Sequence, residues 1–195
     1  MVQTERTTKP QMTRGKRVYL VGMPGVGKSV VARQLAFCLG WTYLDIDACV
    51  VCTSRTTIAD IFELEGESAF RKYEADCVRR AIKISEAVIA TGGGTPVFHK
   101  GMELMLDSGV VIYLEAGIVT LMKHLEESVG GRPLLTDAQS PDMILKDLLN
   151  KRVDTYRRAH FTVQVDEKTP EQIVEDILEA FDSAGRGLNG LQFGG

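Results

Sequence analysis

Residues 22–29 read GMPGVGKS and match the pattern G-x-x-x-x-G-K-[ST] at every fixed position. Glycines in such a loop let successive backbone N–H groups point at phosphate oxygens, and a helix that begins there adds the positive end of its dipole. Lys28 can neutralise the β- and γ-phosphates, and the Ser29 hydroxyl can ligate Mg²⁺. A strand-like run at 17–22 precedes the motif and a helical pattern at 27–39 follows it. These residues predict a site for a nucleoside triphosphate with magnesium.

Two acidic residues, Asp45 and Asp47, follow a second strand-like run at 41–44. In an extended segment, alternation puts both carboxylates on the same side. Such a pair can divide the work, one acid holding magnesium through water and the other orienting the hydroxyl of a phosphate acceptor. A solvated pair of surface acids is the alternative, and the residues alone leave both open.

Two arginines are candidates for binding an anionic acceptor. Arg71 lies in a helical stretch, and a guanidinium can hold a carboxylate or a phosphate with two parallel hydrogen bonds. Glu67 and Glu74 are within helical reach of it, so a surface ion pair is equally compatible with the spacing. Arg152 and Tyr156 are four residues apart in a later helical stretch and share one side of it; a solvated basic face is the alternative there.

Three consecutive glycines, 92–94, follow a third apolar run at 87–90. They permit the backbone to approach a ligand closely, whereas a simple turn does not need three. Farther along, Arg132 lies in a polar stretch between two helical patterns. A mobile lid over about 128–138 would bring this arginine to the transferring phosphoryl group and expel water. An ordinary surface loop with an incidental arginine is the alternative.

The elements that must position these residues alternate along the chain. Alternating strands and helices predict an α/β fold with a parallel sheet covered on both faces, and ligands of such sheets bind beyond the carboxyl ends of the strands. The helix after the phosphate motif places Val30, Val31, Leu35 and Cys38 on one face. The expected strands are 17–22, 41–44, 87–90, 110–114 and 161–165, and the expected helices are 27–39, 58–85 with a break near Gly66, a stretch ending at about 127, 141–158 and 170–181.

Length and composition bound the class of protein. The 195 residues suit one domain, 44% of them are hydrophobic and 25% charged, as is usual for a soluble globular chain. We expect a single domain over 16–182, with flexible tails at 1–15 and 183–195. A net charge of −3 argues against a general binder of nucleic acid or anionic membranes. No apolar run approaches the roughly 20 residues of a membrane span, and residues 1–15 lack the apolar core of a secretory signal.

The four cysteines, at positions 38, 49, 52 and 77, are too few for a disulfide framework. Cys49 and Cys52 form a Cys-x-x-Cys pair, but a structural zinc site needs a second pair of ligands at similar spacing. We expect reduced, mostly buried thiols.

Taken together, these motifs resemble the shikimate kinase family, within the group of P-loop kinases that are similar to nucleoside monophosphate kinases. The resemblance runs from about residue 18 to residue 181. It rests on GMPGVGKS at 22–29, DID at 45–47, IADIFELEGESAFRKYE at 58–74, TGGG at 91–94, GRPLL at 131–135 and KRVDTYRRAH at 151–160. The combination of the FR, GGG and RPLL elements selects this family, since the phosphate motif alone indicates only a nucleoside triphosphate.

The resemblance implies a three-layer α/β/α fold with strand order 2-3-1-4-5, and a reaction of ATP with shikimate that gives shikimate 3-phosphate. It implies an acceptor region at about 47–75 and Mg²⁺ as the cofactor. The catalytic residues would be Lys28, Asp47 and Arg132; the nucleotide ligands Gly25, Val26, Gly27, Lys28, Ser29, Val30, Arg132 and Lys168; the shikimate ligands Asp47, Arg71, Gly92, Gly93, Gly94 and Arg152; and the metal ligands Ser29 and, through water, Asp45.

Two segments depart from the family pattern on the nucleotide-base side. The family often carries an arginine shortly before the lid that stacks on adenine, where this chain has Lys123 and His124. The loop expected to contact the base is 166–170, whose match rests mainly on Pro170.

Three other functions would share parts of this pattern. A gluconate kinase would share the phosphate motif without the other three elements together. Loss of Lys28, Asp47 or Arg132 would have favoured a non-catalytic regulator that binds a nucleotide, but all three residues are present. A switch GTPase would need the Asn-Lys-x-Asp guanine motif, which the sequence lacks. We expect a cytoplasmic monomer that binds ATP and shikimate, with no nucleic-acid or membrane partner.

Overall fold

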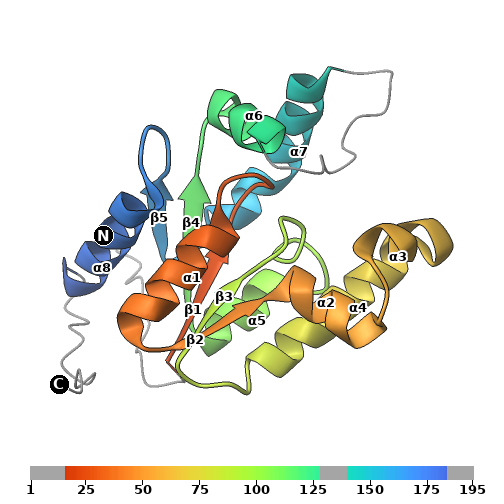
Figure 1. Cartoon of the computed structure of the whole chain (residues 1–195), viewed down its shortest axis with the longest axis horizontal. Coiled ribbons are helices and arrows are strands. Elements are labelled where there is room, and N and C mark those ends of the chain that lie inside the picture. The colour runs from red at the N-terminus through yellow and green to blue at the C-terminus, as the bar shows by residue number, and fades with distance from the viewer. Residues whose placement is uncertain (1–15, 128–139, 184–195) are drawn as a thin grey trace, which may run out of the picture.

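The computed structural model describes residues 16–127 and 140–183, which form one parallel sheet covered by helices on both faces (Figure 1). The strands are β1 (Arg17–Val21), β2 (Thr42–Asp45), β3 (Ala87–Ala90), β4 (Val110–Glu115) and β5 (Phe161–Gln164). The helices are α1 (Lys28–Leu39), α2 (Ile46–Ser54), α3 (Ile58–Leu64), α4 (Gly66–Ala81), α5 (Gly101–Ser108), α6 (Ile118–Glu127), α7 (Pro141–Tyr156) and α8 (Pro170–Ser183).

The sheet has the strand order β2-β3-β1-β4-β5, and all four pairings are parallel. The central strands β1, β3 and β4 are apolar and buried apart from Arg17 at the start of β1 and Glu115 at the end of β4, as expected for strands covered on both faces. The edge strands β2 and β5 are only partly buried. The predicted three-layer fold and strand order are confirmed.

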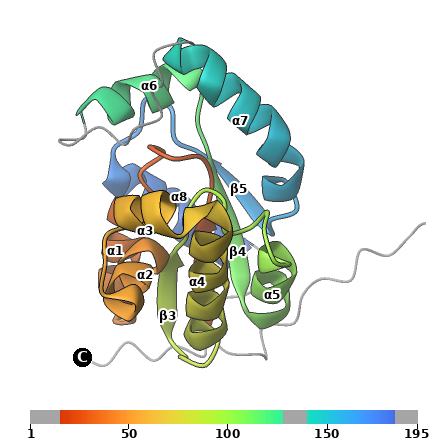
Figure 2. The same ribbon diagram turned by 90° about the vertical axis from the view of Figure 1, so that its right-hand side faces the viewer.

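The helices form two layers around this sheet. Figure 2 shows α1 and α8 on one side of the sheet and α5 and α7 on the other; α4 packs against α5. Beyond the carboxyl ends of β4 and β5, α6 and α7 lie together (Figure 1). No helix among residues 16–127 and 140–183 is both long and apolar enough to cross a bilayer.

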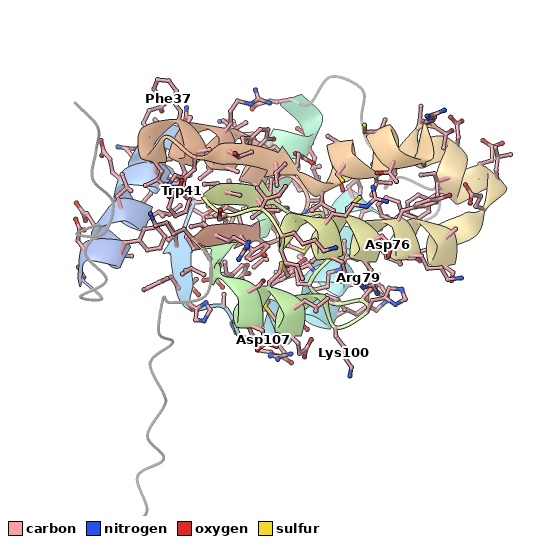
Figure 3. All side chains as sticks on the ribbon, turned by 90° about the horizontal axis from the view of Figure 1, so that it is seen from below. Phe37, Trp41, Asp76, Arg79, Lys100 and Asp107 are labelled. Atoms are coloured by element: carbon pink, nitrogen blue, oxygen red, sulfur yellow. The ribbon has the colours of Figure 1, made fainter. Side chains whose placement is uncertain are left out.

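The buried face of α1 differs from the predicted one. Val31 and Leu35 are buried as expected, but Val30 is 50% exposed and Cys38 is exposed. Because α1 packs against both the sheet and α8, the buried arc is shifted toward Ala32, Ala36 and Leu39. Figure 3 shows Phe37, the neighbour of Cys38, projecting away from the sheet.

The acidic pair does not share one extended segment, so that prediction was wrong: Asp45 ends β2, but the chain turns into a helix directly after it. Asp45 is the N-cap of α2, and Asp47 lies in the first turn of this helix. The short helix α5 was not predicted either. The thiols are unpaired, as expected, but Cys38 and Cys52 are exposed and Cys49 is half-buried, so the prediction of mostly buried thiols was wrong.

Candidate active site

The phosphate loop connects β1 to α1 and presents Lys28 at the first turn of the helix. The Lys28 ammonium donates hydrogen bonds to the carbonyl oxygens of Gly22, at 2.9 Å, and Met23, at 2.8 Å. These contacts fold the side chain back over the loop and leave it only 8% exposed. The first N–H groups of a helix have no partner within it. The loop therefore combines a held cation with a helix N-terminus, as a phosphate site requires.

The Asp45 carboxylate joins the phosphate loop to α2. Its Oδ2 accepts hydrogen bonds from the Ser29 hydroxyl, at 2.7 Å, and from the Tyr43 hydroxyl, at 3.1 Å. Its Oδ1 accepts from the backbone N–H groups of Asp47, at 2.9 Å, and Ala48, at 3.3 Å, which caps α2. Burial, followed by the charge of Asp45, raises the pKa of Tyr43, so this hydroxyl remains a donor. Asp45 is thereby fixed beside Ser29.

The Ser29 and Asp45 oxygens fit a magnesium ion in their chemistry. Both are hard oxygen donors, 2.7 Å apart, at the entrance of a phosphate loop, and Mg²⁺ is usually held by one or two protein groups together with waters and substrate phosphates. Among the described residues, no three His, Cys, Asp or Glu side chains gather into a metal cluster. A magnesium ion here would therefore depend on the nucleotide for most of its ligands.

The glycine loop after β3 lies against charged side chains. A methyl carbon on Gly92 would lie 2.5 Å from Oε1 of Glu74 and 2.9 Å from Oδ1 of Asp47, and one on Gly94 would overlap the Arg71 guanidinium. Only a residue without a side chain allows these approaches. The loop thus forms the floor between Asp47 and Arg71.

Arg71 is held from several sides in the described structure. It pairs with Glu67 at 2.8 Å and with Glu74 at 2.5 Å, and its guanidinium lies 4.5 Å from the ring centre of Phe98. Glu67 is exposed, but Glu74 is buried, so a surface ion pair describes only the first contact. Burial raises the pKa of the Glu74 carboxyl, while Arg71 and a hydrogen bond from Thr95 oppose this rise.

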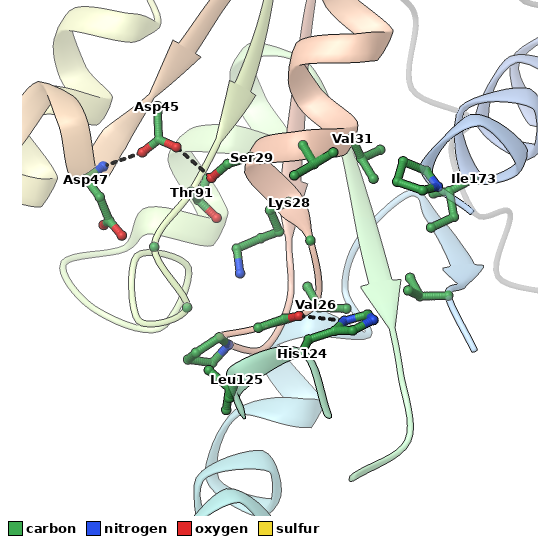
Figure 4. A pocket seen from close by; sticks show the side chains of 18 of the residues that line it. Val26, Lys28, Ser29, Val31, Asp45, Asp47, Thr91, His124, Leu125 and Ile173 are labelled. Atoms are coloured by element: carbon green, nitrogen blue, oxygen red, sulfur yellow. Dashed lines mark hydrogen bonds between the residues drawn. The ribbon is translucent and has the colours of Figure 1, made fainter. Parts of the chain in front are cut away.

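An open cavity of about 610 Å³ brings most of the predicted residues together (Figure 4). Lys28 lies between Asp45 and Asp47 on one side and His124 and Leu125 on the other. Eleven of the predicted residues line this cavity, namely Gly25, Val26, Gly27, Lys28, Ser29, Val30, Asp45, Asp47, Gly92, Gly93 and Lys168.

The remaining predicted residues lie next to this cavity or outside the described chain. Gly94 contacts Arg71 at the floor, and Arg152 approaches Gly93, where a methyl carbon would be 3.1 Å from its Nη1. Lys168 lines the cavity, although its ammonium pairs with Asp176 at 2.6 Å. Arg132 and the predicted lid at 128–138 fall outside the described residues.

Comparisons with known proteins show the family to which this chain belongs. The family model for shikimate kinase matches residues 24–182. The chain is 37% identical over 163 residues to the shikimate kinase of Sulfurihydrogenibium sp. (strain YO3AOP1), which covers 84% of this chain and 96% of the relative. The chain belongs to the shikimate kinase family.

Solved structures of this family have the same fold. A shikimate kinase from Acinetobacter baumannii in complex with shikimate superposes with a TM-score of 0.81 and 33% identity, over 88% of this chain and 95% of that one. One from Aquifex aeolicus superposes with a TM-score of 0.77 and 30% identity, over 88% and 99%. A gluconokinase from Sinorhizobium meliloti has a TM-score of 0.59 at 16% identity over 93% of this chain and 99% of that one, a likeness of the fold alone.

The structure adds several residues to this candidate site and decides between two that the sequence left open. Of the two candidates before the lid, His124 lines the cavity, where its Nδ1 lies 3.0 Å from the Gly25 carbonyl oxygen; this contact requires a proton on Nδ1. Val165 and Ile173 form an apolar wall near the predicted base loop. The signal for Glu74 was its spacing of three residues from Arg71, but the sequence could not show its burial.

Proposed function

We propose that this member of the shikimate kinase family transfers the γ-phosphoryl group of ATP to the 3-hydroxyl of shikimate, which gives ADP and shikimate 3-phosphate. One observation carries the proposal: the phosphate loop, Asp47 and the glycine loop line one cavity, and Arg71 lies directly under that glycine loop. This arrangement supports a nucleotide site in the cavity and, at its floor beside Arg71, a site for an anionic alcohol. The solved relative that holds shikimate supports the choice of acceptor.

On the nucleotide side, residues 25–30 would wrap the phosphates and Lys28 would neutralise the β- and γ-phosphates. Ser29 would ligate Mg²⁺ directly and Asp45 would hold one of its waters, since their oxygens adjoin. When bound, the ion neutralises charge on the phosphate oxygens. The apolar wall of Val165 and Ile173, with Lys168 beside it, lies where a nucleotide base could stack.

On the acceptor side, Arg71 and Arg152 would bind the carboxylate of shikimate, while Gly92, Gly93 and Gly94 would let the ring approach the backbone. Arg71 is well prepared for this role, because Glu74 and Phe98 fix the plane of its guanidinium before any ligand binds. A fixed guanidinium loses little conformational entropy when a planar carboxylate binds to it.

The chemistry follows from these positions. Phosphoryl transfer passes through a loose transition state, so positioning and charge stabilisation supply most of the rate. Asp47 would orient the 3-hydroxyl and accept its proton. Lys28 and, from the sequence alone, Arg132 would stabilise negative charge on the transferring group.

The decisive experiment is a coupled ADP-release assay with ATP, magnesium and a panel of hydroxy acids that includes shikimate and gluconate. We expect shikimate-dependent turnover well above that of every other acid. Equal turnover with gluconate would refute the choice of acceptor, and omission of magnesium should stop the reaction. We also propose that the protein is a monomer and that it is located in the cytoplasm. Size-exclusion chromatography with light scattering tests the first proposal, and cell fractionation tests the second.

A further inference from the structure

Tyr156, the last residue of α7, is a buried polar side chain that the proposed chemistry does not use. It is 0% exposed, and its hydroxyl donates a hydrogen bond of 2.6 Å to the Gly93 carbonyl oxygen. Its ring packs on Tyr113 of β4, with 5.2 Å between ring centres. The side chain therefore connects the end of α7, which runs down beside the sheet (Figure 2), to the glycine loop.

Gly93 is the point at which the glycine loop meets the phosphate loop. A methyl carbon on Gly93 would lie 2.9 Å from Cδ of Pro24 in the phosphate loop and 3.1 Å from Nη1 of Arg152. The Tyr156 hydroxyl is also 4.0 Å from the sulfur of Met23, next to Pro24. A shift of Gly93 would therefore change its distance from both the phosphate loop and a predicted carboxylate ligand.

The tyrosine hydroxyl keeps its proton here and donates it to the Gly93 carbonyl oxygen. Burial raises the pKa of Tyr156 to about 12, although Arg152 opposes the rise, so the phenol stays protonated at neutral pH. The Gly93 carbonyl oxygen is an acceptor in a buried loop, and buried acceptors that lose their donors are destabilised. The hydrogen bond therefore holds the backbone of Gly93 in place at the wall of the cavity.

We propose that Tyr156 is a positioning residue: it fixes the glycine loop relative to the phosphate loop, and so sets the distance between the bound acceptor and the γ-phosphate. Tyr156 does not line the cavity and acts through Gly93. This role rests on the proposed function, because it concerns the geometry of phosphoryl transfer to shikimate. Displacements of about 1 Å can cost roughly 10²-fold in rate, so one hydroxyl group at this position is enough to matter.

The test compares Tyr156→Phe with Tyr19→Phe. Tyr19 is also 0% exposed, and its hydroxyl lies 2.8 Å from Oγ of Ser108, near the amino-terminal end of the sheet. Both variants lose one buried hydroxyl and keep the ring. Thermal melting sets a temperature at which both are folded. We expect Tyr156→Phe to lower kcat/KM for shikimate by about 10- to 10²-fold, with the KM for ATP within about twofold, whereas Tyr19→Phe keeps the kinetic constants of the wild type.

Hydrogen exchange of peptides that span residues 91–95, measured without ligands, gives a second readout that is independent of turnover. Exchange there should be faster in Tyr156→Phe than in the wild type and unchanged in Tyr19→Phe. Equal exchange and equal shikimate kinetics in the two variants would overturn the proposed role of Tyr156. If the wild type itself shows no shikimate-dependent turnover, the proposed function fails and the catalytic part of this role fails with it, while faster exchange in Tyr156→Phe would still support the hold on Gly93.

Discussion

Substitution of Gly92 by alanine gives a sharp test of the site, because its effect can be worked out from the contacts of one methyl group. The added carbon would lie 2.9 Å from Oδ1 of Asp47 and 2.5 Å from Oε1 of Glu74, whereas ordinary contact begins at 3.4 Å. Asp47 must therefore retreat by about 0.5 Å and Glu74 by about 0.9 Å, unless the loop itself moves. If Asp47 retreats, the group that we assign to the acceptor hydroxyl changes its position; if the loop moves instead, the acceptor site changes its shape.

The size of the effect follows from these displacements. Overpacking by one methyl group in a tight interior costs about 1–3 kcal/mol of stability. A misplacement of about 1 Å costs roughly 10²-fold in rate, so a shift of half that size should lower kcat about 10-fold or more. The added carbon has Glu74, Asp47 and Thr95 as its nearest neighbours, so it does not touch the contacts of Lys28 with Gly22 and Met23. We therefore expect the KM for ATP to stay within about twofold of the wild-type value.

The assay is steady-state ADP release at saturating ATP with varied shikimate, at a temperature where the variant is folded. Gly117→Ala is the matched control, because a methyl group there would meet its nearest neighbour, the Asp166 carboxylate, at an ordinary 3.5 Å. It should behave like the wild type. A Gly92→Ala enzyme with wild-type kcat would show that the loop yields without moving Asp47, and would refute the argument for tight positioning.

Three further substitutions test the assigned roles. Lys28→Ala should lower kcat by about 10²-fold or more, because it removes charge stabilisation of the transferring group; more than a tenth of wild-type kcat would contradict the assignment. Arg71→Lys keeps the charge but loses the planar fork, so it should raise the KM for shikimate and leave that for ATP nearly unchanged; the reverse pattern would place Arg71 on the other substrate. Asp47→Asn should lower kcat by about 10²–10⁴-fold with nucleotide affinity within a few-fold; loss of ATP–magnesium binding instead would exchange the roles of Asp45 and Asp47.

The sheet could be predicted from the sequence because its strands carry a strong signal. Runs such as residues 87–90 and 110–114 are apolar at every position, as buried parallel strands require, and they match β3 and β4 closely. The order of the strands in the sheet could not be predicted in this way. No local pattern encodes which strand pairs with which, so the order came from the family resemblance and not from periodicity.

The two missed helices lack the local signals of helices. α2 reads IDACVVCTS, in which β-branched residues and cysteines have low helix propensity, and it is short. It forms because Asp45 caps it and because it packs against α4. α5 has eight residues and no side-chain cap. Its buried Met102 and Met105 are three residues apart, which is the one signal that could have revealed it.

The site was predictable where a motif fixes a backbone shape, and less so where burial decides the role of a side chain. The phosphate motif and the three consecutive glycines are recognisable in the sequence as ligand-binding loops, because few other functions need their glycines. The sequence named Glu74 and Tyr156 only by their helical spacing from Arg71 and Arg152, and it could not show that either side chain is buried. A glutamate and a tyrosine at helical spacing are as common on a surface as in a core, and only the packing of α4 and α7 beside the sheet buries these two.

The acidic pair shows how an error in local structure can leave the predicted position of two side chains unchanged. An extended segment and a capped helix both bring Asp45 and Asp47 to the carboxyl end of β2, which the position after a strand already specifies. The capped helix adds a coupling that the extended form would lack. One oxygen of Asp45 accepts from the Ser29 hydroxyl while the other holds the backbone of Asp47. Asp45 is therefore one direct link between the phosphate loop and the first turn of α2, and we expect a ligand that displaces Asp45 to shift Asp47 as well.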